Sequence, residues 1–396
     1  MLFKQGELKL LWPFYLNMFV YGLSTMIFPF ITLYYLDLGF SFFQISIINA
    51  AYGISMFLFE IPTGAFADGF SRKYSVALGS FIVALSILFI PFTFNFYLIV
   101  VLYALAGIGM TFVSGAEEAW VIDNLNKAER KDLHQEYFIK NGSIDALGAT
   151  LAPIIGAVII KVYSLKILWF VYAIGYLLSG ITVLLFTKEY FKPQKLNPLA
   201  MIKTSYHNSK MGLVFSIRHK VIFFSILAGL CMQLMFIGNI GIQPFLLSLG
   251  MAEHQLGYMY SIGTALGLAA SFLSRYFVKF NPGNLISIVI FIVVLLRLSL
   301  WFIEPPFFIT ACIVFIINGS LFTLVGPIIQ TYFHKFIPGK IRATVVSTKS
   351  MADQLIIASS SLGAGALLDV FGPQKVLALA GLLGIVAMFF YQKIKN

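Results

Sequence analysis

Ionisable side chains lie inside several apolar stretches of this 396-residue chain. The acidic ones are Glu60, Glu117, Glu118, Asp145 and Asp353, and the basic ones are Lys140, Arg297 and Lys349. A charge near the centre of a bilayer costs about 2.5 to 3.5 kcal/mol on insertion scales, so such residues are expected to face a cavity or one another. Burial favours a neutral carboxyl group, and two neighbouring carboxyls seldom ionise together. We therefore expect one of the three glutamates to carry a coupling proton, and the alternative is a static ion-pair network that fixes helix packing.

The apolar stretches around these residues are long enough to cross a membrane. Hydrophobic residues make up 59% of the chain and charged residues 11%, whereas a soluble protein carries roughly 25% charged residues. A spanning helix needs about 20 apolar residues, so the charge-free runs predict an all-α membrane protein. The twelve expected spans are 11–36, 43–66, 74–93, 96–124, 135–161, 166–187, 221–248, 255–278, 285–303, 307–333, 343–369 and 375–392.

The distribution of positive charge sets the expected orientation. The net charge is +11, but with the N-terminus inside, only Lys161, Lys166 and Lys375 fall in outer loops. This asymmetry is the positive-inside rule, so the basic excess indicates membrane topology and not a nucleic-acid partner. Both termini are expected in the cytoplasm. The first apolar run, which begins near residue 10, is too long for a signal peptide and is expected to be the first span.

The spans divide into two halves that repeat weakly. We expect six-span bundles at 1–187 and 221–396, joined by a basic cytoplasmic linker at 188–220 that either lies on anionic lipid or is simply solvated. At an offset near 211 residues, LDLGFSFFQIS (36–46) resembles LSLGMAEHQLG (247–257), and TFVSGAEEAW (111–120) resembles TLVGPIIQTY (323–332). A parallel repeat of this kind is typical of transporters that bind solute at the interface between the halves.

A short motif follows the second span. Residues 64–73, GAFADGFSRK, place an aspartate four residues after a glycine and an Arg-Lys pair four residues after the aspartate. This loop resembles motif A of the major facilitator superfamily, whose members have twelve helices in two pseudo-symmetric six-helix halves. The resemblance covers essentially the whole chain through the span number, the central loop and the repeat.

The resemblance implies a latch that holds the inner side shut. Gly64 would let the second span approach the eleventh, and Asp68 would cap the eleventh, where a helix N-terminus favours a carboxylate by roughly 0.3 to 2 kcal/mol. Arg72, followed by Lys73, would pair with Asp123 at the inner end of the fourth span.

Two residues depart from the family pattern in this loop. Gly69 stands where a basic residue is usual, and Ser71 stands where a glycine is usual. Both departures could loosen the loop while leaving the charged residues of the latch in place.

The fifth span carries a second, weaker resemblance. GATLAPIIGA, residues 148–157, resembles motif C of antiporters at Gly148, Pro153 and Gly156, but Ala152 and Ala157 replace glycines. This favours export, and the alternative is a helix with small-residue packing and a kink. The fourth-span stretch LYALAGIG lacks the basic residue usual in drug and proton antiporters, which counts against that route of coupling.

Helical rise places two of the buried charges at one depth. Glu60 lies eight residues from Asp68 and Lys349 seven residues from Arg342, so both are expected about 10 to 12 Å from the inner surface. Because the resemblance implies that spans two and eleven adjoin, we expect Glu60 and Lys349 to form an inner gate. Lys349 can also pair locally with Asp353, four residues on.

Several other residues are candidates for the gate layer and the cavity. Asp145 and Asp353 could both reach the midplane. Adjacent helical residues point about 100° apart, so Glu117 and Glu118 are expected to face different directions, one toward the cavity and the other toward a neighbouring helix near Lys140. Arg297 is expected to have a structural partner or to snorkel. The uncharged candidates are Asn17, Tyr21, Ser24, Gln233, Asn239, Gln243 and Asn318.

These observations predict a secondary active transporter in the cytoplasmic (inner) membrane. The expected activity is proton-coupled export of a small amphipathic or cationic organic solute by a monomer. The alternatives are an importer or facilitator of a small metabolite, and a non-transporting receptor or scaffold. The histidines lie in loops or at span ends and no nucleotide-phosphate motif is present, so we expect no enzyme activity, metal or cofactor.

Overall fold

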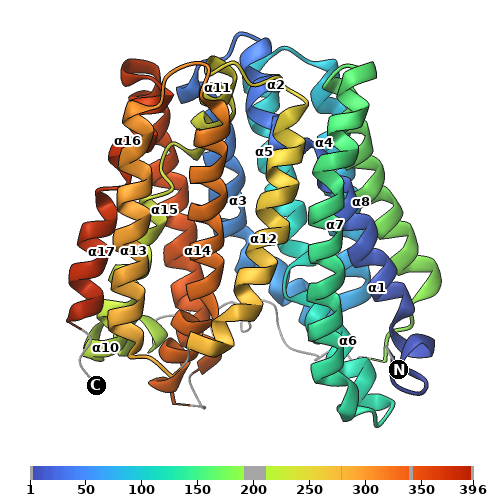
Figure 1. Cartoon of the computed structure of the whole chain (residues 1–396). Coiled ribbons are helices and arrows are strands. Elements are labelled where there is room, and N and C mark those ends of the chain that lie inside the picture. Colours follow the sequence, from blue (N-terminus) through green and yellow to red (C-terminus); the bar gives the residue numbers. More distant parts are fainter. Residues whose placement is uncertain (1–2, 191–210, 278, 339–341, 394–396) are drawn as a thin grey trace. The chain divides into compact units, whose positions relative to one another are not determined.

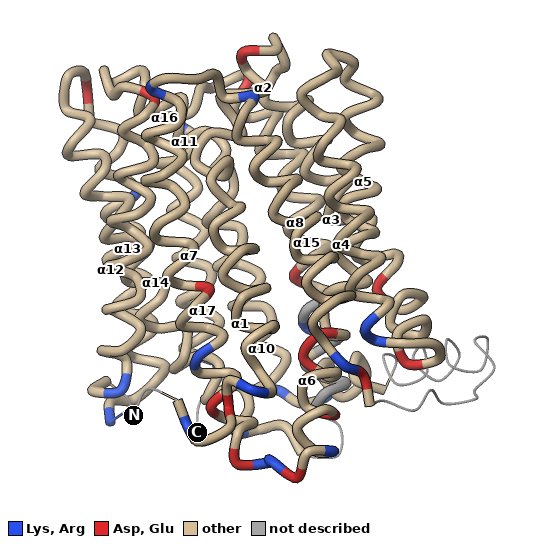
Figure 2. The backbone as a smooth tube through the Cα atoms, turned by 90° about the vertical axis from the view of Figure 1, so that its right-hand side faces the viewer, with Lys and Arg blue, Asp and Glu red and all other residues tan. Residues whose placement is uncertain are grey.

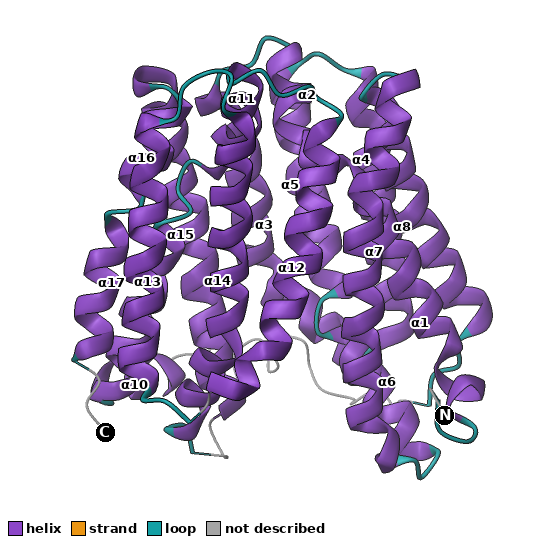
Figure 3. Ribbon diagram, in the orientation of Figure 1, coloured by secondary structure: helices purple, strands orange, loops and turns teal. Residues whose placement is uncertain are grey.

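The computed structural model describes residues 3–190, 211–277, 279–338 and 342–393. Its regular elements over these residues are helices (Figure 3). Within these described ranges, twelve helical segments are long and apolar enough to cross a membrane, which confirms the predicted all-α membrane fold. Residues 191–210 of the expected linker lie outside the described part.

Contacts between Cα atoms divide the chain into two compact units. The first comprises residues 1–28 and 51–205, and the second comprises residues 29–50 and 206–396. The two units do not follow the order of the chain throughout. Residues 29–50 precede most of the first unit in the sequence, but they pack with the second unit.

The first unit is built from long helices packed side by side (Figure 1). They are α1 (Glu7–Ser24), α4 (Arg72–Phe89), α5 (Phe96–Val113), α6 (Ala116–Lys127), α7 (His134–Val162) and α8 (Lys166–Phe186), with residues 51–69 of α3 (Phe42–Gly69). The helix α4 packs against α5 and α8, and α1 packs against α7 and α8. The buried core at one end of this unit includes Leu11, Phe14, Val76, Trp120 and Tyr137.

The second unit contains the helices that follow the linker. They are α10 (Lys220–Leu234), α11 (Ile242–Ser248), α12 (Gln255–Phe277), α13 (Pro282–Ser299), α14 (Phe308–Lys335), α15 (Arg342–Phe371), α16 (Pro373–Ala380) and α17 (Leu383–Gln392), together with α2 (Ile31–Asp37) and the start of α3. The helix α12 packs along α14, and α13 packs against α14 and α17. A buried cluster of the second unit includes Met235, Ile286, Ile290, Val293 and Val294.

The first span of each half is interrupted at an equivalent place. Between α1 and α2 the chain forms a tighter 3₁₀ turn at Thr25–Phe30. Between α10 and α11 the chain leaves the α-helix after Leu234, passes through Gly238, which has a φ of 84°, and re-enters a helix through Asn239–Gly241. A shift of about 211 residues brings residues 25–30 onto 236–241, so the predicted repeat extends to the backbone.

The fourth span is also broken. The helix α5 ends at Val113, and α6 begins at Ala116 after Gly115, whose φ of 72° is a conformation that favours glycine. The equivalent Gly326 lies inside the continuous helix α14. Residues 96–124, expected as one span, therefore form two helices, and the break places an extra helix N-terminus inside the span.

Most charged residues lie near helix ends, and only a few lie along the helices (Figure 2). These few are the ones for which the hydrocarbon environment demands a partner or a cavity.

Candidate functional site

A pocket of about 220 Å³ lies within the first unit. Asn17 and Tyr21 of α1 line it, as the sequence predicted for a cavity, together with Tyr137 and Asn141 of α7 and Tyr176 of α8. The rings of Tyr21 and Tyr176 meet edge to face, with centroids 5.3 Å apart. The residues from α7 and α8 were not among those that the sequence singled out.

Two adjacent glutamates, Glu117 and Glu118, line this same pocket. One of them was expected to face a neighbouring helix instead, but both reach this pocket from the first turn of α6, where Glu117 is partly buried and Glu118 is exposed. The Oε1 of Glu117 accepts a hydrogen bond from Nδ2 of Asn17 over 3.2 Å. Among the described residues, no basic side chain lies within 4.0 Å of Glu117.

Lys140 binds a different carboxylate from the one that the sequence suggested. Its Nζ lies 2.6 Å from Oε2 of Glu7 and 3.1 Å from Oε2 of Glu136. Glu7 is fully buried and also accepts a hydrogen bond from the hydroxyl of Tyr15 over 2.9 Å. This buried pair joins the start of α1 to α7, and it leaves Glu117 without this cation.

The motif A residues form ionic contacts at the start of α4. The Nη1 of Arg72 lies 2.6 Å from Oδ2 of Asp123, and its Nη2 lies 3.0 Å from Oδ1 of Asp68. The Nζ of Lys73 donates a hydrogen bond to the carbonyl oxygen of Thr187 over 2.8 Å. This cluster therefore connects α3, α4, α6 and the end of α8 within the first unit.

Ser71, the residue that departs from the family pattern, caps α4. Its Oγ accepts a hydrogen bond from the backbone N–H of Tyr74 over 3.1 Å and donates one to the carboxylate of Glu189. That carboxylate also accepts from the backbone N–H groups of Arg72 and Lys73. An anion at a helix N-terminus stabilises the helix, so Glu189, which the sequence did not single out, supports the loop.

The motif C-like stretch lies where α7 crosses α1. A Cβ atom added at Gly148 would lie only 2.8 Å from the Cα of Gly22, so the two backbones touch. Pro153 and Gly156 are buried in the same helix. Close backbone contact is the packing that small residues permit in membrane helices, and the direction of transport does not follow from it.

A pocket of about 440 Å³ in the second unit contains the predicted local ion pair. The Nζ of Lys349 lies 2.6 Å from Oδ2 of Asp353, one turn further along α15. Gln233, a predicted cavity residue, lines this pocket together with His334 and Tyr391. Any other carboxylate that binds Lys349 must compete with Asp353.

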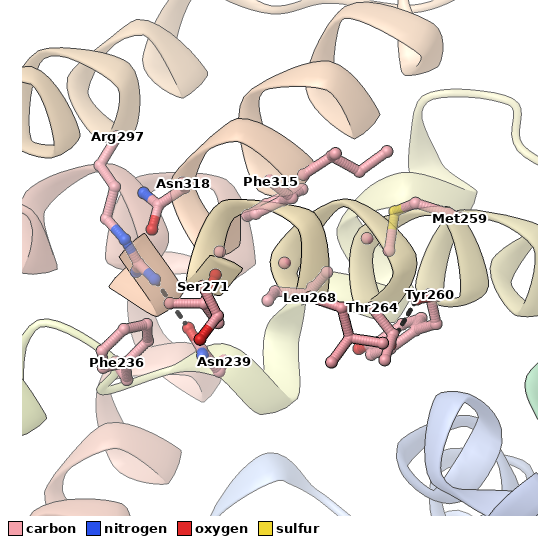
Figure 4. Close-up of a pocket in the computed structure, with 16 residues that line it drawn as sticks. Phe236, Asn239, Met259, Tyr260, Thr264, Leu268, Ser271, Arg297, Phe315 and Asn318 are labelled. Carbon is pink, nitrogen blue, oxygen red and sulfur yellow. Dashed lines mark hydrogen bonds between the residues drawn. The ribbon is translucent and has the colours of Figure 1, made fainter. Parts of the chain in front are cut away.

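A larger pocket of about 540 Å³ also lies within the second unit. Asn239 and Asn318, two predicted cavity residues, line it together with Arg297 of α13. Arg297 does not snorkel, since its exposed fraction is 2%. Its Nη2 donates to Oδ1 of Asn239 over 3.1 Å, and its guanidinium carbon lies 5.2 Å from the centroid of the Phe236 ring (Figure 4).

The remaining uncharged candidates are involved in helix packing. Ser24 is buried and donates a hydrogen bond to the carbonyl oxygen of Tyr21, and a Cβ atom at Gly175 would overlap its side chain. Gln243 is buried, and its Nε2 donates to the hydroxyl of Tyr260, which lines the 540 Å³ pocket. Ser24 does not line the pocket of the first unit, because it faces α8 at this close contact.

One helix cap was not foreseen. The carboxylate of Asp369, near the end of α15, accepts the backbone N–H groups of Phe42 and Phe43 over 2.8 and 2.9 Å. These groups belong to the first turn of α3, and all three residues are part of the second unit. The contact joins residues more than 320 positions apart, which no local pattern reveals.

Other expected contacts join residues of different units and remain predictions. They are the gate between Glu60 and Lys349, the cap of the eleventh span by Asp68, and the close approach at Gly64. Glu60 and Asp145 are both partly buried, on α3 and α7 respectively.

The arrangement of broken spans, pockets and intramembrane charges defines a membrane transporter. The model of the Major Facilitator Superfamily matches residues 14–361, and the chain belongs to this family.

One relative and two solved structures illustrate the similarity. An uncharacterized MFS-type transporter of Bacillus subtilis (strain 168), YxaM, is 24% identical over 386 residues, which cover 93% of this chain and 92% of the relative. The nucleoside transporter NupG superposes with a TM-score of 0.76 at 15% identity, over 96% of this chain and 99% of NupG. A D-xylose-proton symporter superposes with the same TM-score of 0.76 at 15% identity, over 98% of each chain. At these identities the two solved structures show a shared fold.

Proposed function

We propose that this transporter is proton-coupled and that Glu117 carries the proton. The observation behind the proposal is a pocket in which the partly buried Glu117 has an amide partner, Asn17, and no basic partner within 4.0 Å among the described residues. Glu118 supplies a second carboxyl group beside it.

The position of Glu117 suits reversible protonation. Partial removal from water favours the neutral acid, and so does a neighbouring carboxylate. The N-terminus of α6 favours the charged form, because its unpaired N–H groups carry partial positive charge. Because these influences oppose one another, a modest change in hydration or in solute contact can shift the equilibrium between protonated and ionised Glu117.

Transport would proceed by alternating access in the cytoplasmic membrane. The six-span halves, 1–187 and 221–396, would move about the linker at 188–220, with both termini in the cytoplasm and a monomer as the working unit. Glu60 would close the inner side by competing with Asp353 for Lys349, and the motif A cluster around Arg72 would hold that closed state.

The proposed direction is export of a small amphipathic organic solute. It rests on the resemblance of residues 148–157 to motif C. Import is the second candidate, because the structurally similar proteins include a nucleoside transporter and a D-xylose-proton symporter.

The test uses the purified full-length protein in liposomes that contain a pH-sensitive dye. Solutes are presented as a panel of amphipathic cations, amphipathic carboxylates, sugars and nucleosides, with an imposed pH gradient of either sign. We expect solute flux with a matching proton flux, and we expect Glu117→Gln to lose gradient-driven flux while keeping solute exchange at equal pH. Opposite movement of solute and proton supports export, and parallel movement supports import.

The control is Glu253→Gln, which changes an exposed glutamate just before α12, outside the three pockets described. It is expected to behave as the wild type. Gradient-driven flux that survives in Glu117→Gln would refute the assignment of the proton. Solute binding without flux in any arm would instead support a receptor.

A further inference from the structure

The largest pocket described contains a buried cation that lacks a counterion. Arg297 is 2% exposed, and no described carboxylate lies within 4.0 Å of its guanidinium group. Its Nε and Nη1 have no hydrogen-bond partner in the described structure, and its Nη2 has a neutral one, the amide oxygen of Asn239. A guanidinium stays charged in proteins, so the pocket holds a positive charge that protein groups only partly compensate.

A second polar group near this cation is also incompletely bonded. Asn318 on α14 is 3% exposed, and its Nδ2 has no partner among the described residues. Figure 4 shows the side chains of Arg297, Asn318 and Asn239 gathered at one end of the pocket. Arg297 and Asn318 thus present unused N–H donors, which is the chemistry that receives an oxygen anion.

The rest of the pocket suits an apolar body. Its walls carry apolar side chains, which include Phe236, Ile242, Met259, Leu268, Phe315 and Ile316. Space is left by Gly319, where an added Cβ atom would meet nothing within 4 Å. A volume of about 540 Å³ lies in the range of small-molecule sites.

We propose that this pocket binds an amphipathic organic anion, with its carboxylate on Arg297 and Asn318 and its apolar part between α12 and α14. The proposal rests on the proposed transport function and specifies the substrate class within it. It replaces the cationic solute that the acidic residues of the sequence suggested. A simple inorganic anion satisfies the guanidinium but leaves the apolar walls unused, which is why we infer an organic one.

Binding is tested without any gradient, in nanodiscs of neutral phosphatidylcholine that exclude anionic lipid. The probes are radiolabelled 2-naphthoate, the neutral 2-naphthamide and the cationic 2-naphthylmethylammonium, which share one ring system. We expect 2-naphthoate to bind at least about tenfold more tightly than either analogue, since charge-assisted hydrogen bonds contribute differences of this size. Arg297→Gln should abolish this preference, and Arg297→Lys should retain part of it.

Two further variants separate loss of the site from loss of folding. Gly319→Leu fills the pocket without removing the cation and should also abolish 2-naphthoate binding. Arg275→Gln changes an exposed arginine on α12 and should bind as the wild type does. Gel filtration and a thermal melt of each variant report folding.

Equal binding of the three probes overturns the proposal, as does an unchanged preference for 2-naphthoate in Arg297→Gln. Failure of 2-naphthoate to bind also overturns it, and chloride that raises the thermal melt of the wild type but not of Arg297→Gln would then indicate an inorganic anion. Because no flux is measured, these outcomes are independent of proton coupling. A protein that binds 2-naphthoate and shows no pH-driven flux would refute the proposed coupling and leave the anion site intact.

Discussion

The Nη2 of Arg297 donates a hydrogen bond to Oδ1 of Asn239 over 3.1 Å, which joins α13 to the break between α10 and α11. Gly381 packs against the base of the arginine side chain, since a Cβ atom there would lie 2.7 Å from the Cβ of Arg297. Two contacts therefore position the arginine. The backbone of Gly381 packs against its Cβ atom, and the side-chain amide of Asn239 accepts a hydrogen bond from its guanidinium group.

This packing predicts that Gly381→Ala lowers stability. The added methyl group must displace α13, and overpacking of this kind costs about 1 to 3 kcal/mol. The thermal melt of the purified protein, followed by tryptophan fluorescence, should shift to lower temperature. Gly363→Ala is the matched control, because nothing lies within 4 Å of a Cβ atom at that helical position, and an equal loss in both variants would contradict the prediction.

The crossing of α1 and α7 leads to a second prediction. A side chain at Gly148 would strike the backbone of Gly22, so Gly148→Val should destabilise the first unit by about 1 to 3 kcal/mol. Gly142→Val, on the same helix, meets nothing within 4 Å at its Cβ atom and should be much milder. Thermal melts and solute flux are measured together for both. If Gly148→Val melts like the wild type but loses flux, packing does not explain this glycine and a direct role in transport gains support.

Removing one partner of the buried pair of Glu7 and Lys140 should lower the stability of the protein more than removing both partners does. Glu7→Gln leaves the Lys140 ammonium with Glu136 as its remaining carboxylate, which is expected to lower the free energy of unfolding by roughly 1 to 3 kcal/mol. The double variant Glu7→Gln, Lys140→Gln should recover part of this loss, because the ammonium that lost its closest carboxylate is removed as well. Denaturation in mild detergent provides the comparison. Additive losses would show that the two side chains do not interact energetically.

The cap on α3 predicts a local change. Asp369→Ala removes the acceptor of the Phe42 and Phe43 amides, and losing such a cap costs about 1 kcal/mol. Hydrogen exchange at residues 42–46 should accelerate by roughly fivefold to tenfold, as expected for local opening of a helix end. Asp37→Ala, at an exposed aspartate at the end of α2, is the control. Unchanged exchange in Asp369→Ala would mean that other contacts hold this helix start.

The membrane fold could be predicted from the amino-acid sequence alone. Each span must satisfy its backbone within one helix and cover about 20 residues of hydrocarbon, so span number and position follow from composition. Contacts along a single helix could also be predicted, such as that of Lys349 with Asp353, because residues four positions apart lie about one turn from each other.

The contacts between side chains far apart in the sequence became visible only in the folded structure. Arg297 and Asn239 are 58 positions apart, and Asp369 and Phe42 are 327 positions apart. Many faces of these helices are similarly apolar, so hydrophobic pattern does not select one neighbour over another. The break at Gly115 could not be predicted for a related reason. A glycine within an apolar run is compatible either with a continuous helix, as at Gly326, or with a left-handed turn, as at Gly115. Packing of the surrounding helices selects between the two, and that selection placed Glu117 and Glu118 in one pocket.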